Sequence, residues 1–147
     1  MKTERSARIS LWCSRAIFAV VCLLLPCMPR LIAWYGTVRP LEFSSLRAIS
    51  LGFYLCAGPV LFALWRIDQL LRNILKKQIF ITRNVRLLRH ICRCCALVSL
   101  ICLPVSFFYP PLIFLTVIML FLSMMVGVMK NVMTAAVEIR EENDLTV

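Results

Sequence analysis

The sequence predicts an all-α integral membrane bundle of four transmembrane helices, with a cytoplasmic basic amphipathic helix between the second and third spans. Hydrophobic residues make up 61% of the 147 residues and charged residues only 16%, and a soluble domain of this size cannot bury so many apolar side chains. Long uncharged runs flank a basic segment, Lys76 to Cys95, that contains no acidic residue. Charge and proline therefore mark where the spans begin and end.

The first span is expected over about residues 16–35. Arg15 precedes this apolar run, and Trp34 and Tyr35 at its far end are typical of a membrane interface. A cleaved signal peptide is the alternative interpretation. No small-residue cleavage site follows Met28, which favours a retained anchor.

The remaining spans follow from a tryptophan and a proline pair. The second apolar run ends at Trp65, and a later run from Cys94 to Met129 carries no charge at all. The later run is long enough for nearly two bilayers. Pro110 and Pro111 lie near its middle, and tandem prolines cannot continue a helix. The predicted spans are therefore about 16–35, 48–65, 91–108 and 112–129.

Basic residues are distributed unevenly across these spans. With the N-terminus placed inside, only three of the 17 Lys and Arg fall in outer segments, namely Arg30, Arg39 and Arg47. This asymmetry predicts a multi-pass membrane protein with both termini in the cytoplasm, a cytoplasmic loop at 66–90 and a cytoplasmic tail at 130–147. The net charge of +10 then needs no nucleic acid to explain it, and we expect no direct nucleic-acid binding.

The basic segment has helical periodicity. Thr82 is a suitable N-cap, and two sets of residues follow it at three- and four-residue spacing. The basic set is Arg83, Arg86, Arg89 and Arg93, and the apolar set is Val85, Leu88, Cys92 and Cys95. Residues 83–93 are therefore expected to form an amphipathic helix that runs into the third span. It either lies on anionic lipid at the membrane surface or docks an acidic partner or an acidic segment of this chain.

An acidic tail, EIREENDLTV, closes the chain. It either is a solvated helix end or works as a cytoplasmic hook that pairs with the basic helix or binds another protein. In the second interpretation, two kinds of residue make the contacts. The acids are Glu141, Glu142 and Asp144, and the apolar residues are Leu145 and Val147.

The polar residues do not form a catalytic constellation. The only histidine is His90, and none of the four predicted spans contains Asp or Glu. We therefore expect no enzymatic activity, no catalytic residues and no cofactor. Most of the eight cysteines lie in or beside apolar runs, which favours a packing role. Metal binding or lipid attachment at the Cys92, Cys94 and Cys95 cluster is the alternative, although paired ligand spacing is absent.

Two stretches resemble a known family. Phe80, Thr82, Asn84 and Leu88 match a Phe-Thr-x-x-Asn-x-x-x-Leu-like motif after the second span, with Ile81 inserted between Phe80 and Thr82. Residues 141–147 match the ending Glu-Glu-Asn-Asp-Leu-Thr-Val. In these features and in its four-span layout, the chain resembles bacterial membrane proteins of domain of unknown function family 2975. Family members are often encoded beside a small Cro/CI-like helix-turn-helix protein. The resemblance thus implies a cell-membrane protein that restrains or senses for such a regulator.

These observations favour a regulatory or scaffolding membrane protein whose partners are membrane lipids and a cytoplasmic helix-turn-helix protein. A small transporter or an oligomeric channel subunit is the alternative. The absence of an acidic residue from the predicted spans counts against proton-coupled transport. An immunity-type or stress protein and an oligomeric state also stay open.

Overall fold

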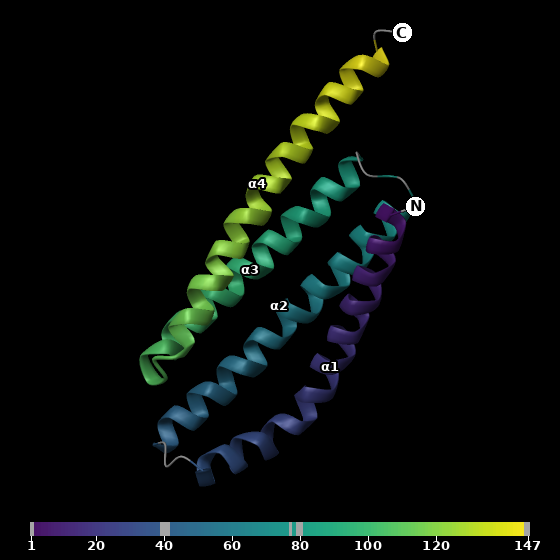
Figure 1. Ribbon diagram of the computed structural model, residues 1–147. Helices are drawn as coiled ribbons and strands as arrows, with labels where there is room; N and C mark the ends of the chain where they lie inside the picture. Colours follow the sequence, from purple (N-terminus) through teal and green to yellow (C-terminus); the bar gives the residue numbers. More distant parts are fainter. Residues whose placement is uncertain (1, 39–41, 77, 79–80, 146–147) are drawn as a thin grey trace.

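The computed structural model describes residues 2–38, 42–76, 78 and 81–145, and their secondary structure is helical. The helices are α1 (Lys2–Val38), α2 (Phe43–Leu75), α3 (Thr82–Phe108) and α4 (Leu112–Leu145), as Figure 1 shows. Each is long and apolar enough to cross a membrane. The all-α class and the four membrane-spanning helices are therefore confirmed.

The helices form an open row (Figure 1). Within the described residues, each helix packs along its neighbours in sequence, α1 on α2, α2 on α3 and α3 on α4. The central helix α3 supplies much of the buried core, including Leu87, Ile91 and Val98. The edge helices α1 and α4 leave large apolar side chains such as Trp12 and Phe121 exposed. Lipid is the solvent in which such surfaces are stable, because a water-soluble monomer seldom exposes them.

The connections place three charged parts of the chain at one end of the row. The start of α1, the connection between α2 and α3, and the end of α4 lie together there, which we call the charged end (Figure 1). At the opposite end, the hydroxyl groups of Tyr35 and Tyr109 are 3.0 Å apart and link α1 to the α3–α4 turn. α4 continues beyond the start of α3 and projects from the charged end.

The prolines end α3 as the sequence predicts. α3 stops at Phe108 and α4 begins at Leu112, with Pro110 and Pro111 between them. The Leu112 amide donates to the Tyr109 carbonyl at 3.0 Å, and this bond closes the turn. The uncharged run is therefore two helices, because the missing amide hydrogens and the proline rings prevent one continuous helix.

The predicted surface helix between the second and third spans needs correction. Residues 83–93 are the first turns of α3, which continues without a break to Phe108. Val85 and Leu88, members of the apolar set, are buried in the helix packing. The connection is short because α2 continues ten residues beyond Trp65, to Leu75. The N-cap of α3 is Ile81, and Thr82 is its first helical residue.

Small polar groups join α3 to α4. Ser99 Oγ donates to the Thr116 carbonyl at 3.1 Å, and Ser123 Oγ donates to the Cys92 carbonyl at 3.1 Å. The Cys92 thiol donates back to the Ser123 carbonyl at 3.3 Å. Interhelical bonds of this kind contribute roughly 0.6–2 kcal/mol each within a membrane. Cys92 thus has a packing role in the α3–α4 contact.

Gly52 permits close packing of α2 on α3. A Cβ atom added at Gly52 would lie 2.8 Å from Val105 Cγ2, whereas one added at Gly127 would lie 3.8 Å from Cys92 Sγ, an ordinary contact distance. We expect Gly52→Ala to lower the free energy of unfolding by about 1–3 kcal/mol, because overpacking forces the helices apart. Gly127→Ala is the matched control and should be neutral or stabilising by up to about 1 kcal/mol, because alanine favours helix. Unfolding of both variants in the same detergent measures the difference, and equal stabilities would contradict this account of the contact.

Candidate functional site at the charged end

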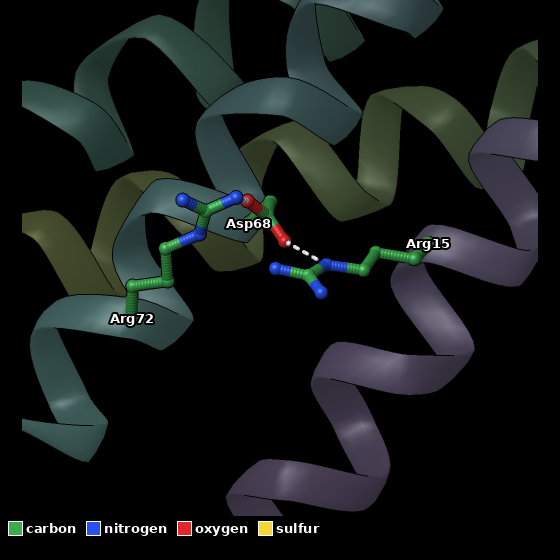
Figure 2. Close-up of polar contacts among 3 residues, drawn as sticks. All are labelled: Arg15, Asp68 and Arg72. Atoms are coloured by element: carbon green, nitrogen blue, oxygen red, sulfur yellow. Dashed lines mark hydrogen bonds and ion pairs between the residues drawn. The ribbon is translucent and has the colours of Figure 1, made fainter.

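An ion-pair cluster joins α1 to α2 near the charged end (Figure 2). Asp68 of α2 lies between two guanidinium groups, with Arg15 Nε 3.1 Å from Oδ1 and Arg72 Nη2 2.6 Å from Oδ2. Arg72 lies one turn from Asp68 on the same helix, whereas Arg15 comes from α1. The Asp68 side chain is 13% exposed, and about half of each arginine side chain is exposed.

The cluster carries more positive than negative charge. Each carboxylate oxygen of Asp68 contacts one guanidinium, so a single negative charge faces two positive charges. Each arginine has five N–H donors and gives only one nitrogen to Asp68, so most donors stay available. A pocket opens beside the cluster, and its lining includes Ser14, Phe18, Leu64 and Trp65. The arrangement can therefore attract an anion into a cleft with apolar walls.

Asp68 lies on the part of α2 that continues beyond the predicted second span, 48–65. Both Asp68 oxygens contact arginine. The sequence signal was the i,i+4 spacing of Asp68 and Arg72, with Asp68 the only acid between Glu42 and Glu138.

An aromatic cluster connects the same part of α2 to α3. The Arg66 guanidinium lies 4.7 Å from the Phe62 ring centroid and 4.8 Å from the Trp65 ring centroid. The Phe62 ring meets His90 of α3 edge to face, with centroids 6.1 Å apart. Arg66 Nε and His90 Nδ1 are buried and have no hydrogen-bond partner in the described part of the protein. The ring contact thus joins Phe62 of α2 to His90 of α3.

Asn84, a residue of the family motif, fastens the connection between α2 and α3. Its side chain is fully buried, at 0% exposed. Asn84 Nδ2 donates to the Gln78 carbonyl at 2.8 Å, and Asn84 Oδ1 accepts from Asn73 Nδ2 at 2.8 Å. The Gln78 amide also donates to the Asn73 carbonyl at 3.1 Å. Asn84 therefore holds the end of α2, the connection and the start of α3 together, which is a structural role.

The other motif residues fall in different places. Leu88 is buried in α3, and Thr82 is exposed at its first turn. Phe80 lies outside the described residues. The motif thus marks the start of α3 and the anchoring of its connection rather than a reactive site.

The basic stripe consists of Arg83, Arg86, Arg89 and Arg93, and all four side chains are exposed. None of them forms a hydrogen bond or ion pair with another residue in the described ranges. The exposed apolar residues Leu97, Leu100 and Phe107 continue the same helix toward the opposite end. Basic side chains at the end of a lipid-facing helix are well placed for anionic head groups.

The acidic tail continues α4 outside the helix row. Glu138, Glu141 and Glu142 are exposed on it. Glu141 lies about two and a half turns from Val132 and so faces the opposite side of the helix, whereas Glu142 lies near the Val132 side. The side chains of Asp144 and Leu145 and the whole of Val147 lie outside what the structure describes. The predicted hook residues are thus spread around α4 rather than gathered on one face.

Fold and charged end together define a multi-pass membrane protein with four spanning helices and a polar end built by α1, α2, α3 and α4. A family model for proteins of unknown function, DUF2975, matches residues 11–147. The chain therefore belongs to the DUF2975 family, which confirms the resemblance seen in the sequence. No curated protein and no solved structure matched the chain in the other comparisons.

Proposed function

We propose that this protein is a non-enzymatic membrane scaffold of the bacterial cell membrane that holds a cytoplasmic regulator at its charged end. In this proposal the charged end faces the cytoplasm, in keeping with the positive-inside rule. The observation that carries the proposal is the projection of α4 beyond the other helices, with apolar side chains still exposed on it. Ile139, on the projection, is 61% exposed, and Val132, level with the start of α3, is 65% exposed.

Helical spacing supports a binding face on this projection. Val132, Ala135 and Ile139 recur at three- and four-residue intervals and are exposed. They therefore share one side of α4. Glu138 and Glu142, spaced four residues apart, flank the same side. Ile139 is nine residues beyond Lys130, about 14 Å along the helix, so lipid at the bilayer core does not cover it.

The chemistry of this face indicates the kind of partner. An apolar stripe with one acidic border suits a protein surface that combines apolar and basic residues, as when a helix binds in a groove. DNA-binding surfaces are basic. A helix-turn-helix regulator, the partner implied by the family resemblance, would therefore be held by the surface that it also uses for DNA. Occupation of the α4 face would then restrain the regulator at the membrane.

We expect the apolar and acidic parts of this face to be needed together for capture. Exposed charge pairs contribute only about 0–1 kcal/mol each, so Glu138 and Glu142 alone cannot make a tight complex. Ile139→Ser should weaken capture at least as much as the double change Glu138→Lys and Glu142→Lys, because buried apolar contacts dominate interface energies. The measurement is co-purification of the helix-turn-helix protein encoded in the adjoining reading frame with the full-length protein in lipid nanodiscs.

Glu42→Lys is the matched control, because Glu42 is an exposed acid at the opposite end of the row. It should leave capture unchanged. Removal of residues 138–147 with no change in capture would contradict the proposal. The absence of a helix-turn-helix reading frame beside the gene would remove that regulator as the partner.

A further inference from the structure

The cleft between α1 and α2 at the charged end combines an unsatisfied positive charge with an apolar wall. Its lining includes Ser14, Arg15, Phe18, Trp65 and Arg72. Asp68 fixes one nitrogen of each arginine and leaves one positive charge uncompensated. Figure 2 shows the two guanidinium groups converging on Asp68 from different helices. A second anion that bridges the remaining donors would complete the balance of charge.

The hydroxyl group of Ser14 is a further donor in this cleft. Ser14 is 7% exposed and lines the pocket. Its Oγ has no hydrogen-bond partner among the residues that the structure describes. Because Ser14 lines the cleft, its hydroxyl group can donate a hydrogen bond to a ligand oxygen there. Ser14 takes no part in the ion pairs of Asp68. Its place in the cleft is therefore an observation independent of the ion pairs that join α1 to α2.

Polar and apolar residues of the cleft are ordered along the membrane normal. α1 enters the membrane from the charged end, so Phe18 lies about one turn deeper than Arg15. α2 leaves the membrane at the charged end, so Trp65 lies about two turns deeper than Arg72. The donors thus face the head-group level and the apolar side chains face the acyl chains. A free phosphate ion would use only the polar part, whereas an amphiphile would use both.

We propose that this cleft is a binding site for one anionic phospholipid, with its phosphodiester group on Arg15, Arg72 and Ser14 and an acyl chain along Phe18 and Trp65. Two guanidinium groups from different helices suit a phosphate, because arginine can give two parallel hydrogen bonds to such an oxyanion. Phe18 and Trp65 line the same pocket and offer aromatic surfaces against which an acyl chain can pack. The bound lipid would tie α1 to α2, the weakest-packed edge of the row, and the site does not depend on any protein partner at α4.

Native mass spectrometry of the full-length protein tests the site. Phosphatidylglycerol is titrated into the detergent-solubilised protein, with phosphatidylcholine as the zwitterionic comparison. We expect one tightly retained phosphatidylglycerol per chain, and a loss of affinity of about fivefold or more for Arg15→Gln or Arg72→Gln. Ser14→Ala should weaken binding by about two- to fivefold without touching the Asp68 ion pairs.

Arg30→Gln is the matched control, because it removes the same charge from an exposed position of α1 toward the opposite end, and it should keep the tightly retained lipid. Equal retention of phosphatidylcholine would overturn the proposal, as would equal losses for Arg30→Gln and Arg15→Gln. Displacement of the lipid by millimolar inorganic phosphate would assign the site to a free anion instead. If the arginine variants do not fold, Ser14→Ala and the comparison of the two lipids still decide the question, and unchanged binding by Ser14→Ala would refute the assigned geometry.

Discussion

Replacing Asn84 with alanine is expected to lower the free energy of unfolding by about 2–4 kcal/mol. The Asn84 side chain is fully buried and bonds both Asn73 and the Gln78 carbonyl. Its removal leaves a side-chain amide and a backbone carbonyl without these partners. A buried polar group that loses its partner costs about 1–3 kcal/mol. The two losses add to the disruption of the turn that joins α2 to α3.

Asn131→Ala is the matched control, because it makes the same chemical change at an exposed position of α4. It should alter stability by no more than about 0.5 kcal/mol. Asn84→Asp keeps an oxygen for Asn73 but places a buried carboxylate against the Gln78 carbonyl, so at neutral pH it should be at least as destabilised as Asn84→Ala. Reversible unfolding in mixed micelles gives the free energies. If Asn84→Ala and Asn131→Ala unfold alike, the hydrogen bonds of Asn84 do not stabilise the connection.

The number of helices could be predicted because long apolar runs and tandem prolines are unambiguous signals in the sequence. Uncharged runs long enough for a bilayer do not occur by chance in soluble domains, and Pro110–Pro111 could only be a break. The ends of α2 were harder to predict. The charges after Trp65 predict the exit from the bilayer and, with it, the end of the second span, yet a helix need not stop at the membrane surface. α2 therefore continues to Leu75 and carries Asp68 into contact with Arg15.

Neighbour relations among the helices could not be predicted from apolar patterns. Faces that meet lipid and faces that meet other helices are both apolar, so hydrophobic periodicity does not distinguish them. Val85 and Leu88, for example, belong to the apolar set of the predicted amphipathic helix and are buried against protein. The better signals were small and polar residues within the spans, because Gly52, Ser99 and Ser123 all lie at helix contacts.

The candidate site could be predicted only in part, because local spacing shows which residues share a helix face but not which helices meet. Arg83, Arg86, Arg89 and Arg93 were correctly placed on one exposed helical stripe, since spacing alone decides that. The cluster around Asp68 joins residues 53 positions apart, Arg15 and Asp68, and no local pattern encodes such a contact. The family motif singled out Asn84, but only the structure assigns it to the connection between the helices.

Reporter fusions are expected to give an all-or-none result for the orientation of the row. Alkaline phosphatase, which is active only outside the cytoplasm, should be active when fused after Pro111 and silent when fused after Gln78 or after Val147. The described basic residues explain this expectation. Arg66, Arg72, Lys76 and the stripe on α3 lie toward the charged end, whereas Arg30 and Arg47 lie toward the opposite end. Positively charged segments beside spans are retained in the cytoplasm.

Fusions of green fluorescent protein at the same three positions are the reciprocal control, because this reporter becomes fluorescent in the cytoplasm. They should fluoresce after Gln78 and Val147 and stay dark after Pro111. The structure ties these results together, since the α2–α3 connection and the end of α4 lie at one end of the row and the α3–α4 turn lies at the other. Phosphatase activity after Val147 together with silence after Pro111 would show that the protein has the opposite orientation in the membrane. The α4 face and the proposed lipid site would then lie on the outer side, where no cytoplasmic regulator can reach them.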